Sequence, residues 1–168
     1  YVADQTSTHA HNLGATPEMA FIKARGSANG WKVYHSALGN NKYVQLHNSN
    51  AASTDTGWAS VNADTFFLKA GNGTYMAWLF DTLDGVSKVG SYSGTGSNVD
   101  VNCGFSSTAR FVLIKRTDST GDWYIYDHAR GIVAGNDPFQ EWNNAAAETG
   151  STDYIDPLST GFTIKRSA

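Results

Sequence analysis

Apolar and polar residues alternate in short stretches along the whole chain, with Gly, Asn, Asp and Ser between the stretches. In residues 121–127 (GDWYIYD), Trp123 and Ile125 alternate with Tyr124 and Tyr126, which places the two pairs on opposite faces of a strand. No window holds apolar residues at helical spacing for three turns. The pattern therefore predicts an all-β protein with almost no helix.

The predicted strands form two series. The first series covers residues 19–25, 31–36, 42–47, 65–70 and 74–80. The second covers residues 86–93, 98–103, 110–116, 122–127 and 161–166. A short helical turn is expected at residues 143–148 (NNAAAE). Strands this short bury their apolar sides only between two packed antiparallel sheets, so we expect a β-sandwich of the jelly-roll or concanavalin A-like type.

The two series have related sequences. Residues 21–39 and 111–131 share five identities at a separation of 92: Ile22/Ile114, Lys23/Lys115, Trp31/Trp123, Tyr34/Tyr126 and Gly39/Gly131. Three further matches have the same order in both series. Residues 11–14 match 101–104 at a separation of 90, and residues 50–52 match 144–146 at 94. Phe66 and Leu68 match Phe162 and Ile164 at 96. This order predicts an internal duplication.

The duplication predicts two β-sandwich repeats, residues 1–85 and 86–168, with the boundary near residues 81–90. The first repeat closes with an apolar strand, NGTYMAWLF (72–80), whose counterpart would begin near residue 168. The second repeat therefore lacks its last strand. We expect the chain to be a fragment, as its start at Tyr1 also suggests, or its second repeat to be completed by another chain.

Composition narrows the range of functions. Only 16% of the 168 residues are charged, and the net charge of -3 argues against nucleic acid as a ligand. No apolar run approaches the length of a membrane span. Cys103 is the only cysteine, which excludes an intrachain disulfide. Because it aligns with Leu13 in the repeat, we expect it to be a small buried hydrophobe.

The sequence offers little for catalysis. Polysaccharide hydrolases need two carboxylates roughly 5 to 9.5 Å apart across the sugar, yet none of the three glutamates has a carboxylate two residues away. We expect Asp153 and Asp156 to lie in a turn (DYIDP), and Asp118 and Asp122 to flank a hairpin turn. Nucleophile elbows and phosphate-binding glycine signatures are absent. We predict no enzymatic activity, no catalytic residues and no cofactor.

Two groups of residues are weak candidates for a metal site. His9 and His11 point to one face if they lie on a strand, so that three such pairs in a trimer could ring a metal; the alternative is an ordinary surface strand. Asn136, Asp137 and Glu141 are the nearest approach to a cluster of calcium ligands. Neither pattern is specific, and we predict no metal.

Four residues are candidates for contact with a ligand or partner. Trp58 and Trp142 lie in expected loops and are not repeated, and Glu141 and Asn143 flank Trp142. Sugars stack on exposed aromatic rings and bind amides and carboxylates at their edges. The alternative for both tryptophans is packing beneath a loop. The repeated Trp31 and Trp123 are expected in the core.

Long phrases resemble a known family: HNLGATPEMAFIKAR, GWKVYHSALGN, NGTYMAWLF, SKVGSYSGTGS, ARFVLIKRTDSTGDWYIYD and DYIDPLSTGF. Over essentially the whole chain they resemble a domain of unknown function found in structural proteins of tailed bacteriophages, in and near tail fibres. The resemblance implies a jelly-roll or concanavalin A-like sandwich, and no catalytic or binding residues.

We therefore expect a non-enzymatic structural component of a phage virion, in a tail fibre or another surface appendage, with a role in host attachment. Its expected partners are other virion proteins, its own copies in a homo-oligomer such as a trimer, and a host surface glycan. The alternatives are a carbohydrate-binding lectin module, which must bind sugar saturably, and a polysaccharide depolymerase, which must release reducing ends.

Overall fold

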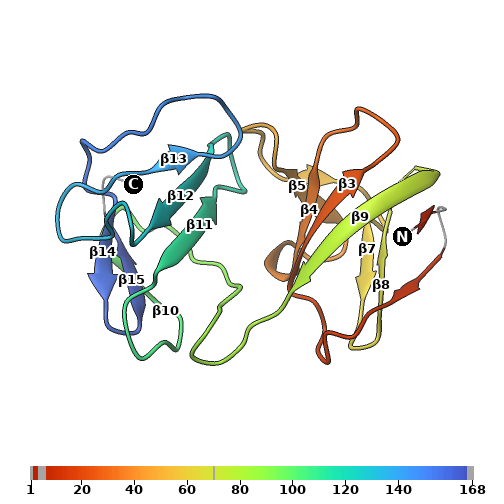
Figure 1. The fold of residues 1–168 in the computed structure, drawn as a ribbon, viewed down its shortest axis with the longest axis horizontal. Coiled ribbons are helices and arrows are strands. Elements are labelled where there is room, and N and C mark those ends of the chain that lie inside the picture. Colours follow the sequence, from red (N-terminus) through yellow and green to blue (C-terminus); the bar gives the residue numbers. More distant parts are fainter. Residues whose placement is uncertain (1, 4–6, 70, 166–168) are drawn as a thin grey trace. The chain divides into compact units, whose positions relative to one another are not determined.

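The structure is a computed structural model that describes residues 2–3, 7–69 and 71–165. Within these residues the regular elements are short β-strands and one turn of 3-10 helix, η1 (Ser36–Leu38). Neighbouring strands pair antiparallel, as in β3–β4 and β11–β12 (Figure 1). The prediction of an all-β antiparallel protein with almost no helix is confirmed. No helix in the described part of the chain is long and apolar enough to cross a membrane.

The chain divides into two compact units. Unit 1 comprises residues 1–82 and 116–121, and unit 2 comprises residues 83–115 and 122–168. Residues 116–121 join unit 1 through two backbone hydrogen bonds: Ala52 N–H donates to Thr117 O at 2.9 Å, and Gly121 N–H donates to Ser49 O at 2.9 Å. The predicted domain boundaries and the jelly-roll type stay predictions.

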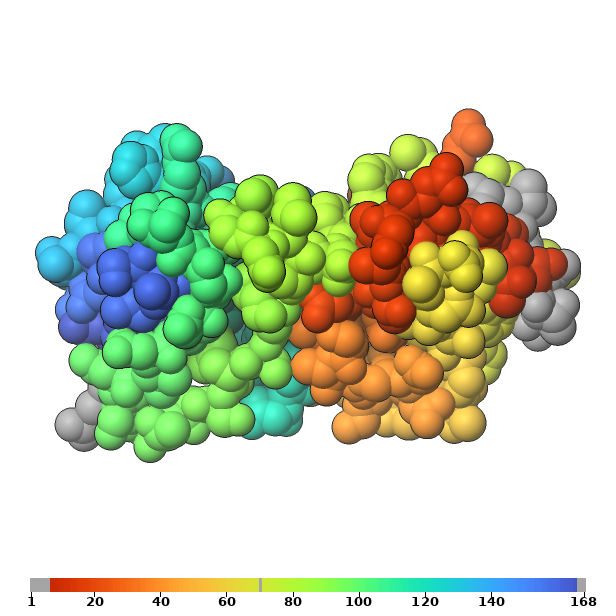
Figure 2. Space-filling view, turned by 90° about the horizontal axis from the view of Figure 1, so that it is seen from below, coloured from red at the N-terminus to blue at the C-terminus, as the bar shows by residue number. Residues whose placement is uncertain are grey.

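Unit 1 contains two sheets. The larger has the strand order β1 (Val2–Ala3), β9 (Gly73–Phe80), β3 (Met19–Ala24), β4 (Lys32–His35), β5 (Lys42–Gln45) and β6 (Ser53–Thr54). The smaller has the order β2 (His9–Ala10), β8 (Thr65–Leu68) and β7 (Ala59–Val61). In Figure 2 the red residues of the β2 region lie beside the yellow residues of the β8 region, with which β2 pairs.

The core of unit 1 draws on both sheets. Alternate residues of β3 (Ala20 and Ile22) and of β9 (Tyr75) meet Phe66 and Leu68 of β8 in one buried cluster. Burial of alternate residues on facing sheets is the arrangement expected of a β-sandwich, and it removes most of the apolar surface of these strands from water.

Unit 2 also has two described sheets and a core of its own. One sheet has the order β11 (Phe111–Lys115), β12 (Trp123–Asp127) and β13 (Gln140–Glu141). The other has the order β10 (Val99–Asn102), β15 (Gly161–Ile164) and β14 (Ile155–Leu158). Val112 and Tyr126 from the first sheet and Ile155, Phe162 and Ile164 from the second belong to one buried cluster.

The two units use the same strand registers. All four residue pairs of β3–β4, from Met19↔His35 to Ile22↔Lys32, recur 92 residues later in β11–β12. All three pairs of β7–β8, from Ala59↔Leu68 to Val61↔Phe66, recur 96 residues later in β14–β15. Below, residues related in this way are called equivalent.

The turns after these hairpins also correspond. Ser36 N–H donates to Glu18 O at 2.7 Å, and the equivalent His128 N–H donates to Arg110 O at 2.9 Å. His35 Nδ1 accepts a bond from Ala37 N–H, and the equivalent Asp127 accepts one from Arg130 N–H. Both side chains accept a bond within the turn, because imidazole nitrogen and carboxylate oxygen are both acceptors. The donors are not equivalent, since Ala37 is two residues after His35 and Arg130 is three residues after Asp127.

Hydrogen bonding corrects two alignments made from the sequence. His11 N–H donates to Asp64 O and Cys103 N–H to Thr160 O, so Cys103 is equivalent to His11 and not to Leu13. Cys103 is only partly buried, although it packs against the core of unit 2.

The second correction concerns Asn144, which was aligned with Asn50. The Asn48 amide donates to Gln45, and the Asn144 amide donates likewise to Glu141, so Asn144 is equivalent to Asn48. Identity over only a few residues misaligned both segments by two positions. Short turns rich in Asn, Ala and Gly give similar matches when one sequence is shifted by a few residues.

Nine of the ten predicted strands contain an observed strand, although residues 70 and 166 at two of their ends lie outside the described residues. The strand predicted at residues 86–93 is wrong: no residue of this segment lies in a strand, and Ser87 forms an isolated bridge to Leu83. This segment is rich in Gly and Ser and mostly exposed, so little burial stabilises a strand there.

The helical turn predicted at residues 143–148 is also wrong. Ala146 N–H donates to the Asn144 side chain at 2.7 Å, and such a local bond competes with helix formation. The short strands β1, β6, β7, β13 and β14 were not predicted as strands, whereas β2 lies where an ordinary surface strand was the alternative to a metal site. Asp156, expected in a turn, lies within β14, whereas Asp153 precedes that strand.

Candidate functional site

The outer side of β9 carries a row of large exposed apolar side chains. Tyr75 points into the core, so the alternation of the strand places Met76, Trp78 and Phe80 on the opposite side, and all three are exposed. The ring of Trp31 stacks on Trp78, with centroids 5.3 Å apart and planes at 27°. We call Met76, Trp78, Phe80 and Trp31 the aromatic face.

A shallow depression of about 530 Å³ adjoins this face. Its lining consists of Arg25, Tyr75, Met76, Ala77 and Trp78. A stacked indole pair offers a flat apolar surface, and a guanidinium offers several hydrogen-bond donors beside it. This combination suits a ligand that presents both an apolar face and polar edges.

The sequence signal for this face is the alternation within residues 72–80. NGTYMAWLF was interpreted as one unbroken apolar strand, although its residues must alternate between two faces. Half of a strand that packs on a single core is left on the outer side. Large residues at those outer positions are the informative feature, because exposed apolar patches mark interaction sites.

Trp58, a predicted contact residue, is 0% exposed and belongs to the core of unit 1. Its ring lies 5.0 Å from that of Tyr43, and Lys32 Nζ lies 4.9 Å from the indole centroid. Burial lowers the pKa of Lys32. The contact prediction is corrected: Trp58 packs beneath the loop, where a ligand does not reach its indole.

Trp58 also has an equivalent residue in unit 2. Lys69 N–H donates to Trp58 O at 2.7 Å, and Lys165 N–H donates to Tyr154 O at 2.9 Å. Trp58 is therefore equivalent to Tyr154, another aromatic residue packed on its core. The repeat is recognised in the sequence from identical residues, which do not reveal this correspondence between Trp and Tyr.

Trp142 lies on the turn after β13, as expected, and is 49% exposed. Its two neighbours have local partners. Asn143 accepts a bond from Trp123 N–H at 2.7 Å and donates to Asp122 at 2.7 Å, and Glu141 accepts from Asn144. These bonds fix the turn, and contact of this group with a ligand stays a prediction.

His9 and His11 both pack against Phe66, with ring centroids 5.7 and 6.2 Å from it. The imidazole of His11 lies 3.1 Å from the carbonyl oxygen of Asn62 and accepts a bond from Leu13 N–H. Among the described residues, no three His, Cys, Asp or Glu side chains are grouped as metal ligands. The contacts of this pair are those of a strand edge on an aromatic ring.

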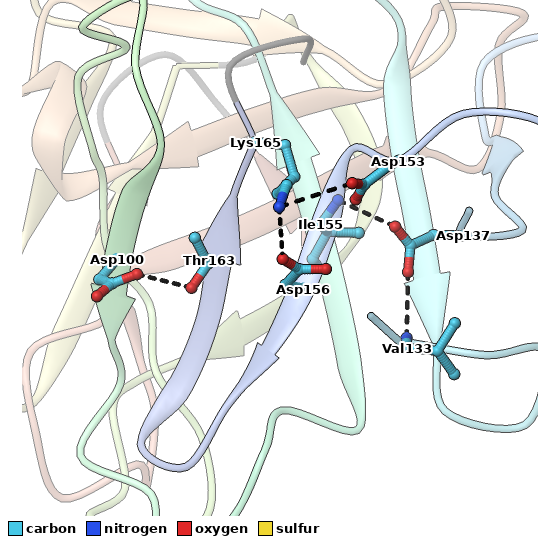
Figure 3. A network of polar contacts seen from close by, with 8 residues as sticks. All are labelled: Asp100, Val133, Asp137, Asp153, Ile155, Asp156, Thr163 and Lys165. Atoms are coloured by element: carbon cyan, nitrogen blue, oxygen red, sulfur yellow. Dashed lines mark hydrogen bonds and ion pairs between the residues drawn. The ribbon is translucent and has the colours of Figure 1, made fainter. Parts of the chain in front are cut away.

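Unit 2 contains a polar network around β14 and β15 (Figure 3). Asp137 is 0% exposed and accepts bonds from Val133 N–H at 3.2 Å and Ile155 N–H at 3.1 Å. Burial raises the pKa of Asp137. Burial, with a smaller contribution from the Asp137 charge, also raises the pKa of Tyr126. A carboxylate enclosed in this way joins backbone segments and does not reach a substrate.

The rest of the network is ionic. Lys165 Nζ lies 2.7 Å from Asp156 and 3.6 Å from Asp153. The hydrogen bond that Lys165 donates to Asp156 is the largest cause that raises the pKa of Lys165. Thr163 donates to Asp100 at 2.6 Å across β15 and β10. In Figure 3 these side chains lie along neighbouring strands and pair with one another. Asp137, which with Asn136 and Glu141 was the nearest approach to a calcium-ligand cluster in the sequence, belongs to this network.

The three glutamates also have local partners. Glu18 accepts a bond from Thr82 N–H at 3.0 Å, Glu141 accepts from Asn144, and Arg130 lies 3.4 Å from Glu148. Each of these contacts holds a turn or a strand end in place.

Comparison with known proteins gives a family and nothing finer. A search among curated proteins and a search among solved structures found no match. One family model, described as Domain of unknown function (DUF7483), matches residues 1–168. The match covers both units and their shared strand registers, and the chain therefore belongs to the DUF7483 family.

Proposed function

We propose that the protein is a non-enzymatic structural component of a bacteriophage virion, in a tail fibre or another surface appendage, and that it contributes to attachment through the aromatic face. The observation that carries the binding role is the exposed row of Met76, Trp78 and Phe80 with Trp31 stacked on Trp78. Large apolar side chains gathered on one exposed face are typical of interaction surfaces. The virion context rests on the resemblance of the sequence to phage structural proteins.

The proposal includes an internal duplication of a β-sandwich. Its support is the repetition of every residue pair of β3–β4 and β7–β8 in the second unit. Tandem copies are an economical way to extend an appendage, because one packing solution is used twice.

A carbohydrate is the second candidate ligand, because of the stacked pair Trp31 and Trp78 beside Arg25. Pyranose rings present an apolar face to an indole, while their hydroxyls accept hydrogen bonds from a guanidinium. This arrangement favours a sugar over a purely apolar partner at the depression.

Two experiments test these proposals separately. For the virion context, purified particles of the encoding phage are labelled with gold-conjugated antibodies against the protein. Label on the tail or an appendage is expected, and particles without label overturn the proposal. The purified recombinant protein serves as the positive control for the antibody.

For the binding role, the protein is applied to host cells and to a glycan array. Trp78→Ala is expected to reduce binding at least about tenfold, since a buried aromatic contact contributes about 2 kcal/mol or more to such surfaces. Tyr92→Ala is the matched control, an exposed aromatic residue outside the aromatic face. Equal binding by both variants excludes the aromatic face. Loss on cells with no signal on the array favours a protein receptor over a glycan.

A further inference from the structure

Two basic side chains lie beside the aromatic face. β3 runs antiparallel to β9, and Lys23 of β3 lies opposite Met76 of β9 (Figure 1). Arg25 follows directly after β3, where its N–H donates to Thr74 O at 2.9 Å. Ala24 between them belongs to the core of unit 1. Alternation therefore places Lys23 and Arg25 on the outer side of the sheet, together with the aromatic face.

Within the described part of the chain, neither of these two cations is paired with a carboxylate. None of the ion pairs found there includes Arg25 or Lys23. Arg25 is exposed and lines the depression, whose other lining residues are uncharged. The Lys23 ammonium donates to the backbone oxygen of Asn29 at 2.6 Å, a bond that does not neutralise its charge. The depression beside the aromatic face therefore carries positive charge without a counterion from the protein.

A second hollow of about 100 Å³ adjoins the depression, and Tyr75 lines both. Its lining includes the hydroxyls of Ser27 and Thr74 and the amide of Asn72. Hydroxyl and amide groups both donate and accept hydrogen bonds. Along the β3–β9 pair the surface thus changes from aromatic to basic to neutral and polar. Such a succession suits a chain-like ligand whose successive residues meet different surfaces.

These features select among classes of glycan. A neutral sugar can stack on Trp78 and bond to the polar residues, but it leaves the charges of Arg25 and Lys23 without a counterion. A carboxylate accepts two parallel hydrogen bonds from a guanidinium, and these are stronger than bonds to neutral hydroxyls. Single-stranded nucleic acid also combines flat rings with anions, but it carries a phosphate at every nucleotide and is bound through longer basic grooves. Two cations beside one stacked indole pair fit a carboxylated sugar better.

We propose that the depression binds an acidic oligosaccharide whose sugar rings carry carboxylates, as in glycans of uronic acids. One ring stacks on Trp78, and its carboxylate pairs with the guanidinium of Arg25, while Lys23 adds positive charge beside it. Hydroxyls of the neighbouring sugar bond to Ser27 and Asn72 in the second hollow. This assignment rests on the binding role proposed for the aromatic face, and it names the class of glycan bound there.

The test uses the full chain and pairs of glycans that differ only in charge. Oligosaccharides of galacturonic, glucuronic and mannuronic acid are prepared as free acids and as methyl esters, and isothermal titration calorimetry in low salt gives their Kd values. We expect at least one acid to bind at least about tenfold more tightly than its ester, because esterification removes a charged hydrogen-bond acceptor. Added salt should weaken binding of the acid and leave that of the ester nearly unchanged.

Variants of Arg25 locate the charge that is recognised. Arg25→Gln is expected to abolish the preference for the acid and to keep binding of the ester, since the stacked indoles remain. Arg25→Lys keeps the charge without the planar fork and should retain part of the preference. Lys42→Gln is the matched control, because Lys42 is an exposed cation of β5 outside the lining of the depression. Circular dichroism checks that each variant folds like the natural protein.

The proposal is overturned if no acid binds, if every acid binds like its ester, if Arg25→Gln keeps the preference, or if Lys42→Gln loses as much of it. Tighter binding of a single-stranded DNA oligonucleotide than of every acidic glycan also overturns it. Host-cell binding by Trp78→Ala separates this failure from that of the proposed function. Cell binding that Trp78→Ala abolishes, without a preference for acids, excludes only the acidic glycan, whereas unchanged cell binding excludes the aromatic face itself.

Discussion

In unit 1 Gly30 faces the imidazole of His47, while at the equivalent place in unit 2 Asp122 accepts a bond from Asn143. A Cβ on Gly30 would lie 1.9 Å from the ring of His47, so only glycine fits beside that imidazole. In unit 2 the side-chain amide of Asn143 is smaller than an imidazole, which leaves room for the carboxylate of Asp122. The same backbone arrangement thus holds two different pairs of side chains.

A second equivalent pair differs in exposure. Leu46 N–H donates to Trp31 O, and Trp142 N–H donates likewise to Trp123 O. Leu46 is buried, whereas Trp142 is exposed. Within this molecule the backbone bonds repeat, while side chains at the surface and at the sheet edges differ. The differing side chains are therefore where a specific role of each unit is to be sought.

The largest expected effect is a difference in stability loss between substitutions in the core of unit 1 and in the core of unit 2. Trp58→Ala is expected to lower the free energy of unfolding of unit 1 by about 3–5 kcal/mol, because a fully buried indole is removed. The equivalent Tyr154→Ala in unit 2 should cost less, since Tyr154 is only partly buried. Hydrogen exchange, read on peptides of each unit, measures both values. Equal losses would contradict the difference in packing.

The next effect concerns the close approach of the paired strands β10 and β15. A Cβ on Gly161 would lie 2.1 Å from the carbonyl oxygen of Val101, so Gly161→Ala must push β15 away from β10. We expect a loss of about 3 kcal/mol in unit 2. Thr65 holds the equivalent position in unit 1, and Thr65→Ala is the control, with a loss below about 1 kcal/mol. Urea denaturation followed by circular dichroism checks both variants.

A buried carboxylate distinguishes unit 2 further. Asp137→Ala leaves two backbone N–H groups without their acceptor, and we expect a loss of about 1–3 kcal/mol at pH 7. Urea denaturation of both proteins measures this loss. A loss confined to unit 1 in hydrogen exchange would contradict the assignment.

The same carboxylate predicts a pH dependence. Burial raises the pKa of Asp137, so the folded state binds this proton more tightly than the unfolded chain does. Its contribution is full below the unfolded pKa and is lost as pH rises through the folded pKa. The stability advantage of the natural protein over Asp137→Asn should thus be larger at pH 3 than at pH 7. An advantage that grows with pH would show the opposite shift.

The smallest effect compares two equivalent lysines. Lys69 pairs with Asp55 at 2.6 Å, and Lys165 pairs with Asp156 at 2.7 Å. Both pairs are partly solvated, so Lys69→Met and Lys165→Met should each cost less than about 1 kcal/mol. Lys165→Met is expected to cost more, because that ammonium also lies near Asp153. Thermal unfolding in low and high salt distinguishes these pairs from packing effects.

Sequence patterns predicted the long strands because alternation and turn residues agree there, as in β11 and β12. The two-residue strands such as β6 were missed because their pairing depends on distant segments and not on local alternation. Pro157 in β14 also disfavoured a strand, although it lies at a sheet edge where its missing N–H is tolerated.

For the candidate site, the chemistry of single residues was visible but burial was not. Trp58 and Trp142 both appeared as unrepeated loop residues, yet one is in the core and the other on the surface. The two tryptophans differ in their backbone bonds: Trp58 N–H donates to Asp55 O within its own turn, whereas Trp142 N–H donates to Trp123 O. The aromatic face follows from alternation within β9, but its exposure requires knowledge of which face packs on the core.

The matching registers of β3 and β11 also bear on how the chain folds. β9 lies between them in the sequence, so during folding it meets two edges of nearly the same shape. Loop closure differs little between the two pairings, because its entropy grows only slowly with loop length. Formation of the native β3–β9 ladder therefore competes with a non-native β11–β9 ladder, a kinetic trap characteristic of proteins with more than one folding unit. Six native pairs and the burial of Tyr75 decide the outcome at equilibrium, but refolding from denaturant is expected to show a slow phase that disappears when unit 1 is folded first.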